Sequence, residues 1–217
     1  VYGPFSGDVT TGAQSIYING KQIPFTGQAD ISTLNLGGVD VVMECTGTAN
    51  SRDVAERGCV AGAKRVLVSG PSEAADQTVV LGANEGDLTD VKIVSNASCT
   101  TNAIAPLLKT LDETFGVMNG HITMVHCYTG NQPTVDAPGP SLERSRAAAV
   151  SMVPTTTNAA NQIARILPHI EGRISVAAIR VPCISVSSID AVLQLQRPPT
   201  SEKDASLLAA LHENPAI

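Results

Sequence analysis

The stretch Ser95-Asn96-Ala97-Ser98-Cys99-Thr100-Thr101-Asn102 places one cysteine among short polar side chains, immediately before an apolar run over residues 103–111. This pattern predicts a helix that begins near Cys99. The first turn of a helix has unpaired N–H groups and the positive end of the helix dipole, and both stabilise a thiolate. Cys99 is therefore a candidate nucleophile. A capped helix with an incidental small residue is the competing interpretation, and the octet alone does not exclude it.

Upstream of this stretch, short apolar runs bounded by turn residues predict buried strands. They lie at residues 39–45, 65–68, 78–82 and 91–94. Ser51 is placed to cap a helix over 52–61, and Asn19-Gly20 predicts the turn of a β-hairpin. Because strands alternate with a helix, the first hundred residues indicate a mostly parallel α/β sheet.

Three small residues follow two of these strands and are candidate ligand-binding residues: Thr46, Gly47 and Ser69. Ligands of open α/β sheets bind at the carboxyl ends of the strands. Turn chemistry explains the same residues equally well. The sequence contains no phosphate-binding G-x-G-x-x-G fingerprint. A dinucleotide site in this sheet would therefore lack its first strand and its glycine loop.

Downstream, the apolar run over 122–129 predicts a strand with His126 near its end, followed by a turn-rich segment over 130–140. A lone histidine in such a place is more often a satisfied structural residue than a catalytic one. Residues 152–158 supply hydroxyls and an amide at the start of a helix that ends near Leu167, which suits either capping or phosphate binding. Two further strands, over 174–181 and 186–196, look antiparallel and separate from the first sheet.

Composition argues against several classes of function. Twenty acidic and 14 basic residues give a net charge of -6 without a long basic run, which argues against nucleic acid and membrane surfaces as partners. No apolar run approaches the roughly 20 residues of a membrane span, and no secretion signal is visible. We therefore expect a soluble, cytoplasmic protein. The five cysteines include no C-x-x-C pair and are expected to be reduced thiols without a metal.

Five motifs, in their order and spacing, resemble the phosphorylating glyceraldehyde-3-phosphate dehydrogenase family. They are the octet at 95–102, Val125-His126-Cys127-Tyr128-Thr129, Arg144-Ser145-Arg146-Ala147-Ala148, Pro154-Thr155-Thr156-Thr157 and Arg180-Val181-Pro182. The resemblance covers nearly the whole chain. It implies an α/β fold with a partial Rossmann-type NAD-binding domain over 1–98. A partial α+β catalytic domain with a mixed or antiparallel sheet would follow over 99–217. A homotetramer is implied, in which the loop at Asp136-Ala137-Pro138 reaches a neighbouring subunit's cofactor.

The same resemblance implies a chemical role for each candidate residue. Cys99 would add to the aldehyde of glyceraldehyde 3-phosphate, with His126 as the base, and hydride would pass to NAD. Inorganic phosphate would then cleave the thioester to give 1,3-bisphosphoglycerate. Thr129 and Arg180 match the site of the substrate phosphate. The other phosphate-binding candidates are Ser98, Thr100, Arg144, Thr157 and Asn158, and the residues that match positions beside the cofactor are Thr46, Gly47 and Ser69.

The chain also departs from the family pattern. Asn158 stands where the family usually has glycine, beside the pocket of the attacking phosphate. The family's N-terminal glycine loop and C-terminal end are not in the sequence, which predicts a fragment of a longer protein. Two other functions stay open. One is erythrose-4-phosphate dehydrogenase, in which water cleaves the thioester. The other is a catalytically silent paralogue, which the presence of both Cys99 and His126 argues against.

Overall fold

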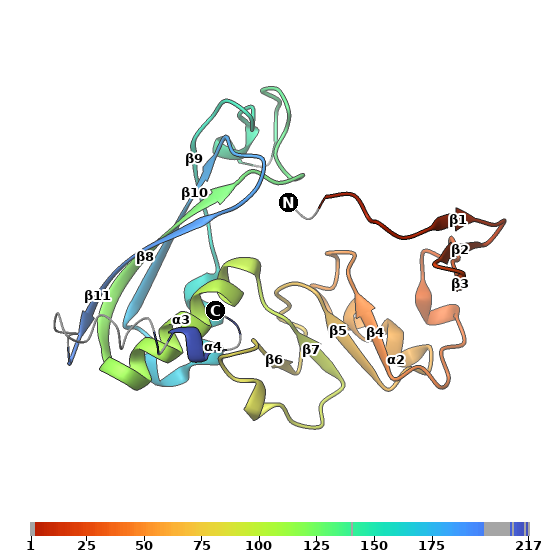
Figure 1. Cartoon of the computed structure of the whole chain (residues 1–217), viewed down its shortest axis with the longest axis horizontal. Helices are drawn as coiled ribbons and strands as arrows, with labels where there is room; N and C mark the ends of the chain where they lie inside the picture. The colour runs from red at the N-terminus through yellow and green to blue at the C-terminus, as the bar shows by residue number, and fades with distance from the viewer. Residues whose placement is uncertain (1–2, 140, 198–208, 210, 215, 217) are drawn as a thin grey trace.

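The computed structural model describes residues 3–139, 141–197, 209, 211–214 and 216. Within this part the strands form three sheets, and the helices lie beside the second and third of them (Figure 1). The first sheet is small and antiparallel, with β1 (Val9–Thr11), β2 (Ser15–Ile18) and β3 (Lys21–Pro24). The predicted hairpin is confirmed, because Asn19 and Gly20 connect β2 to β3 with φ angles of 49° and 78°. A type I′ turn requires such positive values.

The second sheet is parallel, as the sequence predicts. It contains β4 (Val41–Glu44), β5 (Arg65–Val68), β7 (Ile93–Ser95) and β6 (Gln77–Thr78), in that spatial order. Val66 and Val68 bury one face of β5. The short helical segments of this region are η1 (Ile31–Thr33), α1 (Arg52–Ala55), α2 (Arg57–Val60) and η2 (Glu85–Asp87).

Two expectations for this region are wrong in detail. The single helix expected over 52–61 is interrupted at Glu56, which separates α1 from α2. The strand expected over 78–82 ends at Thr78. Its continuation is prevented by Asn84, whose Oδ1 accepts the N–H of Val80 and whose Nδ2 donates to the carbonyl of Thr78. The side chain thus occupies backbone groups that a longer strand would need for its ladder.

The longest helix, α3 (Cys99–Phe115), follows β7 directly. Its apolar side chains Ile104, Leu108, Leu111 and Phe115 recur every three or four residues and are buried. This spacing places them on one face of the helix. Gly116 ends the helix with a φ of 73°, and its N–H donates to the carbonyl of Asp112 at 2.8 Å. Glycine adopts such a left-handed conformation without steric cost.

The third sheet is mixed. Its spatial order is β11 (Ser188–Leu195), β8 (Val117–Cys127), β10 (Ile174–Val181) and β9 (Val153–Thr155). The last two strands run in opposite directions, as expected, but they are not neighbours, because β8 lies between them. β8 pairs in parallel with β10 and antiparallel with β11. The chain returns to the start of β10 through α4 (Ala159–Ile166) and η4 (Pro168–Ile170), which gives the parallel direction.

One hydrophobic core joins the two halves of the chain. It contains Ile104 and Leu108 of α3 and Ile163 of α4, together with Val80 and Ala83 from the segment after β6. All five are at most 4% exposed. The packing therefore continues across residue 98, the domain boundary that the family resemblance implies.

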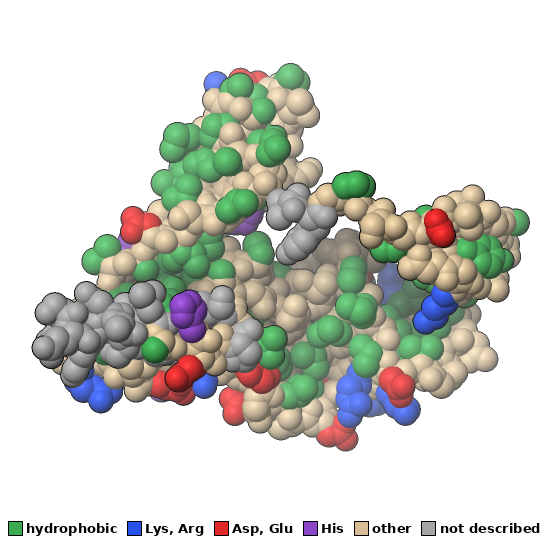
Figure 2. Space-filling model, in the orientation of Figure 1, with side chains coloured by type: hydrophobic (Ala, Val, Ile, Leu, Met, Phe, Trp, Pro, Cys, Tyr) green, Lys and Arg blue, Asp and Glu red, His purple; other side chains and the backbone are tan. Residues whose placement is uncertain are grey.

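The segment between β8 and β9 forms the upper end of the molecule in Figure 1 and contains η3 (Glu143–Ser145). Hydrophobic side chains gather on this upper part in Figure 2. Those most exposed in the segment and in its approach to β9 are Val135, Leu142, Val150 and Met152, each at least 68% exposed. Among the helices described, none has both the length and the apolar character needed to cross a bilayer.

Candidate active site

A tight turn between β7 and α3 places Cys99. Ser95, the last residue of β7, donates its hydroxyl to the carbonyl of Gly70 and accepts the N–H of Ala97. Ala97 is 2% exposed and has a φ of 55°. A non-glycine residue adopts this conformation only where its surroundings impose it. Asn102 closes the turn, since its Nδ2 donates to the carbonyls of Asn96 and Ser98 at 2.6 and 2.9 Å.

Ser98 caps α3, and the predicted start of the helix at Cys99 is confirmed. The Ser98 Oγ accepts the N–H of Thr101 at 3.1 Å and lies 2.8 Å from the Thr101 hydroxyl. Cys99 is the first helical residue and its side chain is exposed. The sulfur is thus open to solvent at the positive end of a 17-residue helix, which favours a negative charge there.

His126 lies near the end of β8 and faces this sulfur. The distance from Cys99 Sγ to His126 Nε2 is 3.4 Å. On the other side of the ring, Nδ1 lies 2.6 Å from the carbonyl oxygen of Cys127. A carbonyl only accepts hydrogen bonds, so Nδ1 carries the proton and Nε2 presents its lone pair to the thiol. The backbone thereby selects the tautomer that can accept the proton of Cys99.

Arg180 of β10 lies beside this pair, because β10 runs next to β8 in register, with Arg180 opposite His126. Its Nη1 donates to the carbonyl of Cys127 at 2.9 Å and to the hydroxyl of Thr129 at 3.2 Å. The same atom is 3.2 Å from His126 Nδ1, and since both carry protons we interpret this as two donors sharing one carbonyl. Burial lowers the pKa of Arg180, and nearby Arg144 lowers it further, although Cys99 and Cys127 oppose the shift.

Arg144 of η3 is held by two threonines of the β9 region. Its Nε and Nη2 donate to the Thr155 hydroxyl at 2.9 and 2.5 Å, and Nη2 also lies 3.4 Å from the carbonyl and the hydroxyl of Thr156. Sequence reasoning did not assign Thr155 and Thr156 a role, although both stand in the motif that carries Thr157. Among the described residues, Arg144 makes no hydrogen bond to Ser98 or Thr157, which the sequence analysis names with it as phosphate-binding candidates.

The other phosphate-binding candidates have structural contacts of their own. Thr157 accepts the N–H of Ala159 through its hydroxyl at 3.1 Å and so caps α4. Asn158 is exposed, and its side chain makes no capping hydrogen bond. Its φ of -94° is ordinary for any residue, so asparagine needs no strained backbone here. Thr100, in the first turn of α3, is only 8% exposed.

The cofactor candidates Thr46, Gly47 and Ser69 are exposed at the carboxyl ends of β4 and β5. These ends lie at the same edge of the parallel sheet as the end of β7. Glu44 fixes the position of Thr46, because its Oε1 accepts the N–H and the hydroxyl of Thr46. Its other oxygen, Oε2, is buried and has no hydrogen-bond partner in the described part of the chain. Sequence reasoning did not identify this carboxylate.

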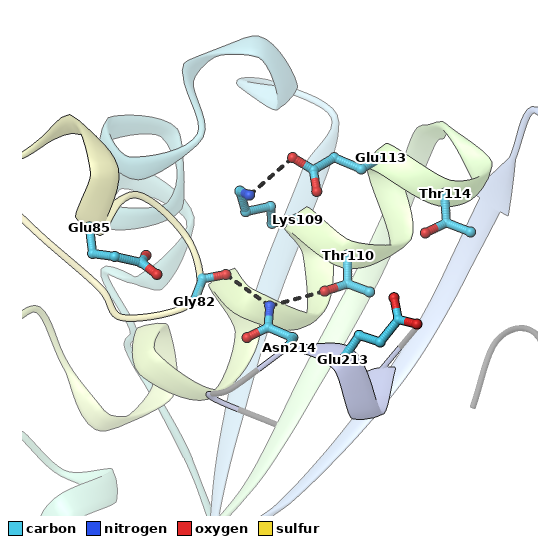
Figure 3. A pocket seen from close by; sticks show the side chains of 8 residues that line it. All are labelled: Gly82, Glu85, Lys109, Thr110, Glu113, Thr114, Glu213 and Asn214. Carbon is cyan, nitrogen blue, oxygen red and sulfur yellow. Dashed lines mark hydrogen bonds and ion pairs between the residues drawn. The ribbon is translucent and has the colours of Figure 1, made fainter. Parts of the chain in front are cut away.

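A polar pocket outside this site lies between α3 and the C-terminal segment (Figure 3). It measures about 300 Å³. Asn214 donates from Nδ2 to the carbonyl of Gly82 at 2.9 Å and to the hydroxyl of Thr110 at 3.1 Å, which ties this segment to α3. No group of three or more potential metal ligands occurs among the residues described.

Comparison with known proteins identifies relatives over almost the whole chain. A family profile described as "Glyceraldehyde 3-phosphate dehydrogenase, C-terminal domain" matches residues 98–215. The chain is 43% identical over 212 residues to glyceraldehyde-3-phosphate dehydrogenase of Cereibacter sphaeroides. It is 42% identical over 216 residues to the protein of the same name from Geobacillus stearothermophilus. Each match covers 97% of this chain and 64% of the relative, so the chain spans a little under two thirds of their length.

Proposed function

Because this chain belongs to the glyceraldehyde 3-phosphate dehydrogenase family, we propose that it supplies the catalytic cysteine, the base and the phosphate-binding residues of one reaction. That reaction is the NAD-dependent oxidation and phosphorylation of D-glyceraldehyde 3-phosphate to 1,3-bisphosphoglycerate. The observation that carries the proposal is the 3.4 Å contact between Cys99 Sγ and His126 Nε2. A thiol that faces an imidazole lone pair at the start of a helix is arranged to attack a carbonyl carbon.

His126 serves the reaction as base and then as acid. It first takes the proton of Cys99, so that the thiolate adds to the aldehyde, and it returns this proton to the aldehyde oxygen, which gives the hemithioacetal hydroxyl. The neutral imidazole then accepts the hydroxyl proton as hydride leaves and the carbon is oxidised to a thioester, and it later protonates the departing sulfur. The carbonyl of Cys127 keeps the ring in one orientation through these steps, because it accepts a hydrogen bond from His126 Nδ1, with 2.6 Å between nitrogen and oxygen.

Arg180 and Thr129 would bind the phosphate of the aldehyde. The Arg180 guanidinium remains protonated at neutral pH although burial lowers its pKa, because arginine starts from a very high value. It can therefore donate charge-assisted hydrogen bonds to a phosphate oxygen. Ser98, Thr100, Arg144, Thr157 and Asn158 are proposed for the attacking phosphate, among which Arg144 is the charged residue.

The edge at Thr46, Gly47 and Ser69 fits one side of a dinucleotide. Gly47 has a φ of 75° and leaves open space where a Cβ would stand, so backbone can approach a ligand there. The buried Glu44 Oε2 at this edge, which has no partner among the described residues, is an acceptor of the kind that a polar ligand group satisfies. NAD, when bound here, would accept the hydride that leaves the substrate carbon. The residues of this chain hold the substrate and move the protons.

We also propose that the protein assembles as a homotetramer. The exposed apolar side chains of the segment between β8 and β9 support this, since apolar surface in one place favours contact with another protein surface. Asp136 accepts the N–H of Ala147 at 2.7 Å and pairs with Arg146, so the segment has a defined fold of its own. Size-exclusion chromatography with light scattering would measure the assembly, and a monomer at micromolar concentration would contradict it.

The activity is tested with the purified protein, D-glyceraldehyde 3-phosphate, NAD and inorganic phosphate. We expect NADH to form together with an acyl phosphate that hydroxylamine traps. Cys99→Ser should reduce the rate by about 1,000-fold or more, because the thioester cannot form. Cys183→Ser, which changes another exposed cysteine, is the matched control and should leave the rate unchanged. Equal NADH formation with and without phosphate would contradict the phosphorylating reaction and indicate cleavage by water.

A further inference from the structure

A cavity beside Arg144 combines a guanidinium, a carboxylate and hydroxyl groups. It measures about 620 Å³ and is lined by Ser141, Glu143, Arg144, Pro154, Thr155 and Thr156. A tetrahedral oxyanion is small enough to enter it. The sequence motifs do not assign Glu143 any role, yet its carboxylate borders a cavity whose arginine is proposed to bind phosphate. This combination needs an explanation, because a carboxylate repels an anion.

Arg144 lines this cavity and keeps one nitrogen without a hydrogen-bond partner among the described residues. Threonine oxygens engage its Nε and Nη2, and they orient the guanidinium plane. Its Nη1 makes no hydrogen bond within the described residues. Arg180 lies near enough for the charge of Arg144 to lower its pKa. The cavity therefore lies in a positively charged neighbourhood and offers N–H groups to an anion.

Glu143 lines the same cavity and has one carboxylate oxygen without a hydrogen-bond donor among the described residues. Its Oε2 accepts the Ser141 hydroxyl at 2.6 Å, while Oε1 makes no hydrogen bond within the part of the chain described. The hydrogen bond from Ser141 is the main cause that lowers the pKa of Glu143, and Arg144 contributes in the same direction. The carboxylate is therefore ionised at neutral pH. It can accept a hydrogen bond but has no proton to donate.

We propose that Glu143 and Arg144 together select oxyanions that carry a proton, so that this cavity accepts inorganic phosphate and rejects phosphomonoesters. Arg144 donates to an unprotonated oxygen of the anion, and Glu143 accepts the P–O–H proton. A phosphomonoester dianion and sulfate have no such proton, and each would place an oxygen lone pair against the carboxylate. This inference rests on the proposed function for its biological meaning: it keeps phosphomonoesters away from Arg144, which is proposed to bind the attacking phosphate.

The test compares three anions of equal charge by isothermal titration calorimetry. At mildly alkaline pH, hydrogen phosphate, methyl phosphate and sulfate are all dianions, and hydrogen phosphate alone carries an O–H. The unmodified protein should bind hydrogen phosphate about 10- to 100-fold more tightly than the other two, the range that one hydrogen bond to a charged group supplies. In Glu143→Gln the preference should fall below about threefold, because an amide can both donate and accept.

Two further variants control the result. Arg144→Lys should weaken binding of all three anions, because lysine lacks the planar fork that Thr155 and Thr156 orient. Glu85→Gln makes the same chemical change in the pocket of Figure 3 and should leave the preference intact. Equal binding of the three anions by the unmodified protein, or an unchanged preference in Glu143→Gln, would overturn the inference. A clear preference without NADH formation would contradict only the proposed function.

Discussion

Helices α3 and α4 both begin after runs of short polar residues, but the residues at the two helix starts have different roles. At α3, Ser98 accepts the N–H of Thr101, and Cys99 beside it faces a histidine. At α4, Thr157 accepts the N–H of Ala159, and Asn158 makes no side-chain capping bond. The local sequences are alike, and both starts satisfy backbone N–H groups. What separates them is the neighbour, because β8 brings an imidazole to the first helix start.

Replacing His126 should make the Cys99 thiol, at the start of α3, react like an ordinary exposed cysteine. In the unmodified protein we expect iodoacetamide to label Cys99 faster at neutral pH than Cys45 or Cys183, which are also exposed. In His126→Asn the rate at Cys99 should fall by about 10- to 100-fold, because no base takes the proton. Peptide mass spectrometry reports each cysteine separately, so Cys45 and Cys183 serve as internal controls. Equal labelling of all three in the unmodified protein would show that the Cys99–His126 contact does not activate the thiol.

The buried face of α4 offers a larger change in stability than its cap. Gln162 is 1% exposed, and neither its Nε2 nor its Oε1 has a hydrogen-bond partner among the described residues. Gln162→Leu should raise the free energy of unfolding by about 1–3 kcal/mol, because it removes buried polar atoms without opening a cavity. Urea denaturation measures the change. Gln14→Leu, at an exposed position, should stay within about 0.5 kcal/mol of the parent, and a loss of stability in Gln162→Leu would reveal a partner for the amide.

The residues at the N-cap positions of the two helices, Ser98 and Asn158, provide the smallest and most direct comparison. Ser98→Ala should lower the free energy of unfolding by about 1 kcal/mol, because the N–H of Thr101 loses its acceptor. Asn158→Ala should change it by no more than about 0.3 kcal/mol, since the Asn158 side chain makes no capping hydrogen bond within the described residues. Thermal and urea unfolding of both variants, measured under the same conditions, give the two changes in the free energy of unfolding. Equal losses would mean that the side chain of Asn158 caps α4 in solution.

Local signals predicted the features that depend on neighbouring residues. The Asn19-Gly20 turn and the start of α3 follow from backbone preferences a few residues long. The parallel sheet follows from its short apolar strands. The pairing of β8 with β10 does not, because it depends on the path through α4 and η4. Likewise the strand expected over 78–82 fails because of one side chain, Asn84, which competes for its backbone groups.

The candidate site likewise contains some features that the local sequence predicts and others that it does not. The first turn of α3 made Cys99 a nucleophile candidate from its local sequence, and the resemblance to a known family brought in His126. The structure places the two 3.4 Å apart. The contacts of Arg144 with Thr155 and Thr156 join segments that no local pattern relates. The tautomer of His126 depends on a backbone carbonyl, which has no sequence signature at all.

The core that crosses residue 98 also constrains how such chains can recombine. A chimera joined at that residue would confront Val80 and Ala83 of one parent with Ile104, Leu108 and Ile163 of another. Side chains packed this tightly tolerate little change in volume. A crossover placed before residue 79 would inherit the whole cluster from a single parent. In exchanges between relatives, the heritable unit is therefore longer than the catalytic half that the chain order suggests.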